Sequence, residues 1–315
     1  MGKKLINASH VEGTVYQHDL ELKKTGAHSK TPGTEYITGT LQIATDAAGL
    51  NIVPVHFNYV TATYGKSGKT NDTYGVLMNF INNVYKTTMK DGAEKATKVR
   101  VDGAIGLNEF YDRKKEGTLV SVKRNEGSFV HVVAEVNEDE KKRNEFDVDM
   151  IIIDASRKEP DEEKNIPEKV IVKGYIFNFQ KAIMPVEFTV LGAAAMDYFE
   201  GLGATSREPV FTRVRGSQIS ETIVKRVTEE GAFGEPVVKE VKNTRKDFVL
   251  TWAAKEIYEW DSEETILAAD VLKAKSEREV YLAGLKKNYE DWKATQGQGA
   301  ITASAPAPAN GGFDF

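Results

Sequence analysis

Pairs of basic side chains occupy matching positions in two similar segments, and their spacing suits contact with anionic groups such as phosphates. The segments read TKVRVDGAIGLNEF around Gly103 and FTRVRGSQISETI around Gly216. Successive side chains of a β-strand point to opposite faces, so the valines are expected to point inward and the basic residues outward. The outward residues are Lys98 and Arg100 in the first segment, and Arg213 and Arg215 in the second.

Aromatic side chains accompany basic ones on other predicted strands. In VIVKGYIFNF, Val172 and Ile176 share the inner face with the glycine. Exposed aromatic rings are costly unless another group covers them. Unpaired bases of a nucleic acid can cover such rings by stacking on them, while Lys and Arg bind the phosphates. The alternative is that these rings pack under long loops or against a C-terminal helix. The candidates are Lys173, Tyr175, Phe177 and Phe179 here, and Phe110, Tyr111, Lys123 and Arg124 in the first half.

The sequence repeats itself on a larger scale. Residues 35–60, EYITGTLQIATDAAGLNIVPVHFNYV, resemble residues 170–191, VIVKGYIFNFQKAIMPVEFTVL. Each copy has a mid-strand glycine (Gly39, Gly174) and a Pro-Val-x-Phe core. An internal repeat fixes the architecture. Three strands, a helix and two more strands in each half predict a mainly β protein with two tandem OB-fold-like five-stranded barrels.

The expected organisation follows the repeat. We predict a first barrel at 1–140 and a second at 141–258, with short helices at 74–87 and 193–202 and loops at 157–168 and 226–246. Asp261 and Glu264 form a capping-box pattern before an apolar helical stripe. The region 259–294 is therefore predicted to hold one helix, at 262–293, which packs on a barrel or on a second copy of the chain. Residues 295–315, rich in Gly, Ala and Pro, predict a flexible tail.

Composition narrows the class of protein. The chain has 315 residues, of which 40% are hydrophobic and 28% charged, with a net charge of −5. Residues 1–134 carry 17 Lys and Arg against 13 Asp and Glu, and residues 169–255 carry 13 against 10, so both repeat cores are mildly basic. There are no cysteines, which excludes disulfides and thiolate chemistry. Five scattered histidines and the lack of a long apolar run predict no metal or cofactor, no membrane contact and a cytoplasmic protein.

One segment suggests nucleotide binding instead. Residues 63–70, TYGKSGKT, end like a phosphate-binding P-loop, and MIIID at 150–154 resembles an apolar strand that ends in a magnesium-binding Asp. The motif, however, requires glycine where Thr63 stands, and the helix begins only after several further residues. The chain also lacks the alternation of strands and helices that a parallel sheet requires. A P-loop-like ATPase therefore stays an alternative hypothesis, with Lys69 as its test residue.

Tandem barrels, a Pro-containing tail and an aromatic-acidic end resemble the single-stranded DNA-binding proteins of bacteria and bacteriophages. GTLQIATDAAGLNIVPVHF is similar to the second and third strands of their barrels, and Phe313, Asp314 and Phe315 are similar to their partner-recruiting tip. This chain departs from them in a nearly uncharged tail and a single acid at the tip. Two barrels in one chain and the extra helix look more like a phage protein.

The resemblance implies a non-catalytic protein that binds single-stranded DNA with little sequence preference during replication, recombination and repair. Its tip is expected to recruit a polymerase, helicase or primase. A structural or virion assembly protein is a further alternative, and it would self-associate through the 262–293 helix.

Overall fold

The computed structural model describes most of the chain apart from short gaps and the C-terminal tail. Of residues 221–245 and Gln296 only the backbone is described. The described ranges are 5–27, 29–65, 67–113, 117–161, 166–229, 237–261 and 267–296. The tip residues Phe313, Asp314 and Phe315 therefore lie outside the described part. Across the described ranges, none of the helices combines the length and apolar character that crossing a membrane requires.

Five strands of the first half pair in a closed ring. β1 pairs with β3 and β5, β3 with β4, and β5 with β6, all antiparallel, and the parallel pair β4–β6 closes the ring. Two helices lie between β4 and β5, and a short strand, β2, extends the edge beside β3. The elements are β1 Asn7–His18, β2 Glu21–Lys24, β3 Glu35–Ala44, β4 Ile52–Thr61, α1 Asp72–Ile81, α2 Thr88–Asp91, β5 Lys98–Tyr111 and β6 Leu119–Val132.

The second half repeats this pattern of pairing. β7 pairs with β8 and β10, β8 with β9, and β10 with β11, all antiparallel, and the parallel pair β9–β11 closes the ring. Its helix, α3, again lies between the third and fourth strands of the ring. The elements are β7 Asn144–Lys158, β8 Lys169–Phe177, β9 Ile183–Val190, α3 Ala193–Gly201, β10 Val210–Glu229 and β11 Val237–Ala253.

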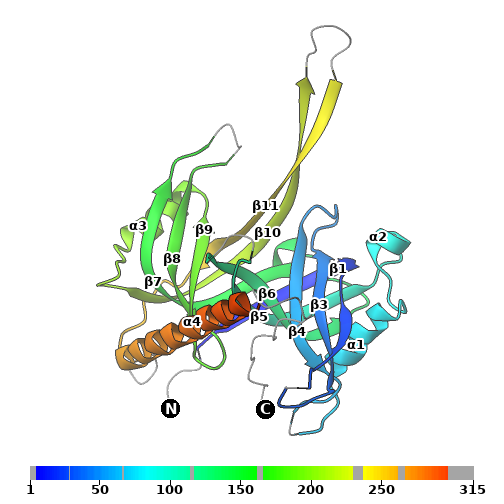
Figure 1. Ribbon diagram of the computed structural model, residues 1–315. Helices are drawn as coiled ribbons and strands as arrows, with labels where there is room; N and C mark the ends of the chain where they lie inside the picture. Colours follow the sequence, from blue (N-terminus) through cyan, green and yellow to red (C-terminus); the bar gives the residue numbers. More distant parts are fainter. Residues whose placement is uncertain are drawn as a thin grey trace.

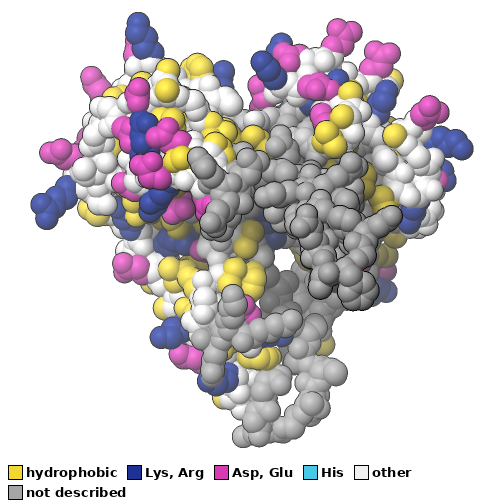
Figure 2. All heavy atoms as spheres, turned by 90° about the horizontal axis from the view of Figure 1, so that it is seen from above, with side chains coloured by type: hydrophobic (Ala, Val, Ile, Leu, Met, Phe, Trp, Pro, Cys, Tyr) yellow, Lys and Arg dark blue, Asp and Glu magenta, His cyan; other side chains and the backbone are white. Residues whose placement is uncertain are grey.

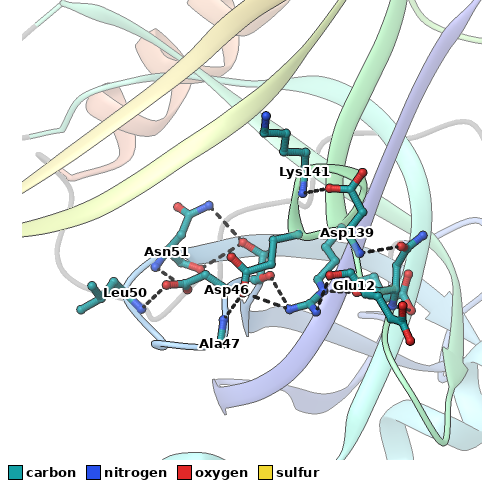
Figure 3. Close-up of polar contacts among 12 residues, drawn as sticks. Glu12, Asp46, Ala47, Leu50, Asn51, Asp139 and Lys141 are labelled. Atoms are coloured by element: carbon teal, nitrogen blue, oxygen red, sulfur yellow. Dashed lines mark hydrogen bonds and ion pairs between the residues drawn. The ribbon is translucent and has the colours of Figure 1, made fainter.

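The two rings are joined into one continuous sheet. The first residues of β1 also pair with β7, so that Asn7 lies opposite Val148 (Figure 1). The segment between the rings contains a 3-10 turn, Glu140–Arg143, and is fastened to the first ring. The Glu140 carboxylate accepts the Ala47 N–H at 2.7 Å, and Glu12 accepts the Asn137 N–H at 2.9 Å (Figure 3).

A buried polar group stiffens the contact between the rings. The Asn125 amide on β6 donates to Gln218 on β10 at 2.5 Å, and Asn51 donates to the Gln218 carbonyl at 3.3 Å. Asn144 on β7 donates to the same carbonyl. Buried amides that satisfy one another in this way fix one relative placement of the strands that carry them.

The last helix, α4 (Ala268–Gln296), lies along both rings (Figure 1). On the second ring Val271 and Ala274 are buried in a cluster with Phe177 and Phe211. On the first ring Arg278 forms an ion pair with Glu109 of β5. The predicted C-terminal helix is therefore confirmed from Ala268 onward, and its expected first residues, 262–266, lie outside the described part.

The mainly β architecture predicted from the sequence is confirmed, and two finer expectations are wrong. Residues 226–229 and 237–246 are not a loop, because they continue β10 and β11 as a ribbon that projects from the rings (Figure 1). The glycines Gly39 and Gly174 are not equivalent either. Phe57 pairs with Gly39, whereas its counterpart Phe188 pairs with Val172.

The second pair of glycines does hold equivalent places. In each ring a β-bulge interrupts the pairing of the last two strands, between Asp102 and Gly103 in one and between Arg215 and Gly216 in the other. A Cβ at Gly103 would overlap the Glu126 carbonyl, and one at Gly216 would overlap that of Val249. Glycine is therefore required here by the close approach of the partner strand.

Candidate nucleic-acid interface

The aromatic face predicted on β8 is covered by α4. Val172 and Ile176 face inward as expected, but Phe177 on the outer face is 1% exposed within the cluster that contains Val271 and Ala274. Tyr175 is half-buried, and the Lys275 ammonium lies 4.8 Å from its ring centroid. The expectation that Phe177 is exposed is therefore wrong, since the helix supplies the cover. Phe179, beyond the end of β8, is exposed.

The two arginines of β10 face outward and share one carboxylate. Arg213 binds both oxygens of Asp147, with Nε–Oδ1 at 2.7 Å, and Arg215 donates its Nε to Oδ2 at 2.9 Å. The pKa of Asp147 is held below its usual range, because these bonds outweigh the opposing effect of burial. The two arginines point outward as predicted, and Asp147 neutralises one of their two charges.

The other predicted cations also have partners. Lys98 donates to the Ala134 carbonyl at 3.4 Å, and Arg100 lies 3.3 Å from Asp102. Lys173 lies between Asp154 and Glu187, 3.9 Å from each. On β5, Phe110 is exposed. Tyr111 stacks on Tyr289 of α4 with 5.4 Å between ring centroids.

Two of the predicted cations, Lys123 and Arg124, meet in a cleft between the rings. The cleft has a volume of about 380 Å³, and β4 and β6 of the first ring face β9, β10 and β11 of the second across it. Residues up to 194 positions apart in the sequence meet there. Its lining consists of Pro54, His56, Ser121, Val122, Lys123, Arg124, Glu187, Thr189, Gln218, Lys246, Asp247 and Phe248, and we call it the inter-ring cleft.

Lys123 is the most unusual group of the inter-ring cleft. Its ammonium lies 4.3 Å from the Phe188 ring centroid and 4.6 Å from that of Phe248, and it donates to the Glu187 carbonyl. Burial lowers the pKa of Lys123 to about 7, against the opposing attraction of Asp247 and Glu187. The cleft therefore gains positive charge when the pH falls below neutrality.

The pKa of His56, in the same cleft, is strongly lowered. It is lowered to about 4, first by burial and then by the charge of Arg124, with a further contribution from Lys246. His56 is therefore neutral at pH 7. Arg124 is held in place by the Glu126 carboxylate at 3.1 Å and by the side-chain oxygen Oδ1 of Asn58 at 2.9 Å.

Next to Asn58 lies an aromatic pair that sequence patterns did not indicate. Tyr36 of β3 and Tyr59 of β4 have ring centroids 4.7 Å apart, and Tyr59 is exposed. Because side chains two residues apart on a regular strand share a face, Tyr59 would be expected to point into the ring like the buried Phe57. A bulge opposite Ile37 and Gly39 shifts the alternation and turns it outward. The pair, Asn58, Arg124 and the inter-ring cleft thus form a connected strip on the outside of β4 and β6.

Charges of both signs are interspersed on one face of the molecule. Figure 2 shows Lys, Arg, Asp and Glu side chains interspersed on both lobes of the face seen from above. Binding of a polyanion therefore depends on local groups, such as those of the strip, rather than on a broad positive field.

The P-loop hypothesis loses its structural basis. Gly68, Lys69 and Thr70 are exposed in a turn closed by the Thr63–Thr70 bridge. The following helix, α1, has an acid, Asp72, in its first turn, where a bound phosphate would lie. Its neighbouring strands belong to a closed ring of mostly antiparallel pairs rather than to a parallel α/β sheet.

Comparison with known proteins identifies the family. The chain belongs to the YorF family, which it matches over residues 5–288. A comparison with curated proteins gives no match.

Two solved structures with partial similarity are single-stranded DNA-binding proteins. One is a deletion mutant of the single-stranded DNA binding protein from Thermus aquaticus, with 12% identity over 83% of this chain and 99% of the other and a TM-score of 0.44. The second is a replication protein A heterotrimer bound to single-stranded DNA, with 10% identity over 77% and 49% of the two chains and a TM-score of 0.21. At these scores neither similarity carries weight for fold or function, so the function has to be argued from the chain's own residues.

Proposed function

We propose that this protein binds single-stranded DNA, with little sequence preference and without catalysis, along the strip from Tyr36 and Tyr59 to the inter-ring cleft. We interpret each ring as an OB-type barrel, whose outer strands commonly hold single strands. The observation that carries the proposal is the aromatic pair of Tyr36 and the exposed Tyr59 next to Asn58, which binds Arg124. Arg124 lines the inter-ring cleft together with Lys123 and Lys246. Flat rings stack on unpaired bases of any sequence, and cations follow the phosphates.

The contacts favour a single strand over a duplex. Stacking on Tyr59 requires an unpaired base, and a cleft of about 380 Å³ has no room for a double helix. Roles in replication, recombination or repair belong to the same proposal, as does recruitment of a polymerase, helicase or primase by Phe313–Phe315. Origin in a bacteriophage and self-association through α4 are further parts of it.

Fluorescence anisotropy with a labelled 30-mer of dT, at two salt concentrations, tests the proposal. We expect Lys246→Ala to weaken binding equally for dT and mixed sequences. It should lower the slope of log affinity against log salt by about 0.7, the value for one phosphate contact with a single strand. Lys286→Ala, which removes an exposed lysine of α4, is the matched control and should change neither quantity.

Loss of the aromatic ring should have a different signature. Tyr59→Ala should cost about 1–3 kcal/mol of binding free energy with an unchanged salt slope, and Tyr59→Phe should restore most of it. Absence of binding to dT at low salt, or equal affinity for duplex DNA, would refute the proposed function.

A further inference from the structure

The bulge in the last two strands places an aromatic residue at the same position of both rings. Immediately before it, Asp102 lies opposite Phe129 in the first ring and Arg215 lies opposite Trp252 in the second. Phe129 is 44% exposed and Trp252 43% exposed. Large rings exposed to this degree at equivalent places call for a comparison of their surroundings.

The charged residues that pair with Phe129 and Trp252 have opposite signs. In the first ring the residue opposite Phe129 is the acid Asp102, which is bound to His10 at 2.8 Å. In the second, the Arg215 guanidinium lies over the Trp252 ring, 4.5 Å from its centroid. Arg100, 3.3 Å from the other oxygen of Asp102, offsets part of the negative charge of that carboxylate. An anion is therefore less favoured near Phe129 than near Trp252, where a guanidinium also has donors to spare beyond the Nε that binds Asp147.

The second of these aromatic residues, Trp252, borders a pocket. The pocket has a volume of about 200 Å³ and lies between α3 and β11. The small side chains of Ala195 and Ala253 leave this space open. Tyr198 forms one wall, and its hydroxyl donates to the Ala254 carbonyl at 3.2 Å. The lining residues are Ala195, Tyr198, Phe199, Leu250, Thr251, Trp252 and Ala253.

The first ring fills the corresponding place with its own helix. Thr73 of α1 donates to the Ser128 carbonyl at 3.2 Å and accepts the Val130 N–H at 3.3 Å. Ser128 occupies the bulge in the same way as Thr251 does. The helix of the first ring is therefore bonded to the strand at the bulge itself. The helix of the second ring is bonded to Ala254, just after β11, and a pocket lies beside Trp252.

We propose that the pocket beside Trp252 holds one base of the bound single strand, with the adjoining phosphate on Arg215, and that Phe129 holds none. This inference rests on the proposed function and adds to it a second contact site and an asymmetry between the rings. A volume of about 200 Å³ lies below the ~300–1,000 Å³ of pockets for drug-sized ligands, which suits a single base. Lys246 of the inter-ring cleft and Trp252 are six residues apart on β11, about 20 Å along the strand, so one strand of several nucleotides can reach both.

Anisotropy with the labelled 30-mer of dT tests this assignment with one matched pair of variants. We expect Trp252→Ala to weaken binding about 5- to 150-fold, the range for one stacked base, and Trp252→Phe to retain most of the affinity. Phe129→Ala, with the same exposure and the equivalent position, should stay within twofold of the wild type. Ala195→Leu fills the pocket and leaves Trp252 and Arg215 in place, so it should reproduce the loss.

The outcomes separate this inference from the proposed function. If the wild type does not bind dT, the proposed function fails. If the wild type binds while Trp252→Ala and Ala195→Leu bind equally well, the pocket assignment is wrong and the proposed function stands. An equal loss in Phe129→Ala overturns the asymmetry. If circular dichroism shows that Trp252→Ala is unfolded, the affinity of Ala195→Leu for dT tests the pocket assignment instead, and unchanged affinity in that variant overturns it.

Discussion

The ion pair between α4 and the first ring allows a sharp test of how the helix is held. Arg278 donates to both oxygens of Glu109, at 2.5 and 3.1 Å. The side chains are 15% and 3% exposed, respectively. Replacing Arg278 by Ala leaves the Glu109 carboxylate buried without its counter-charge, which costs about 3–5 kcal/mol. We therefore expect Arg278→Ala to lower the free energy of unfolding by that amount.

Denaturant unfolding followed by tryptophan fluorescence measures this effect. One of the three tryptophans, Trp292, lies on α4 with the Arg113 guanidinium 4.5 Å from its ring centroid. The double variant Glu109→Leu/Arg278→Leu should lose much less, since it leaves no charge buried. Lys286→Ala, whose partner Glu290 is exposed, should stay within about 0.5 kcal/mol of wild type. A loss below about 1 kcal/mol in Arg278→Ala, the value of an exposed pair, would refute the reasoning.

Two further predictions concern the inter-ring cleft and the bulges. Because the pKa of Lys123 is lowered to about 7, affinity for dT should rise as the pH falls from 8 to 6, and Lys123→Met should abolish this dependence. The unfolded lysine keeps its proton up to about pH 10.4, so stability should rise with pH between about 7 and 10, measured by denaturation, and less so in Lys123→Met. Gly216→Ala should destabilise the protein by about 1–3 kcal/mol, because the added Cβ would overlap the Phe146 ring and the Val249 carbonyl. Gly284→Ala, on the exposed surface of α4, should stabilise it by up to about 1 kcal/mol. Equal melting temperatures of the two variants would contradict this prediction.

Local patterns in the sequence predicted which side of each strand is apolar. Val99 and Val101 are buried and Arg100 is exposed, as alternation requires. Leu77 and Phe80 are buried on α1, which ends at Ile81, before the end of the helix predicted at 74–87. These properties depend on residues close together in the chain, and a period of two or 3.6 reports them directly.

Contacts between distant segments could not be predicted in this way. The outer face of β8 was identified correctly, but the sequence does not say that Val271 and Ala274 cover Phe177. Asp147 lies 66 residues before Arg213, and only the register of β7 with β10 brings the two together. The bulge that turns Tyr59 outward likewise depends on pairing and not on the residues of one strand.

The exchange of charge between the rings has a calculable consequence for a phosphate bound next to either aromatic. Two unit charges 4 Å apart in water interact by about 1 kcal/mol, so a phosphate is disfavoured by about that much beside Asp102 and favoured equally beside Arg215. The difference of about 2 kcal/mol corresponds to a preference of roughly 30-fold for the second ring. Arg100 beside Asp102 in the first ring, and Asp147 and the buried Asp149 in the second, reduce this preference. Salt screens it as well, since the Debye length falls to about 3 Å at 1 M. The preference for Trp252 over Phe129 should therefore shrink at high salt to what the pocket alone provides, because stacking in an uncharged cavity does not depend on ionic strength.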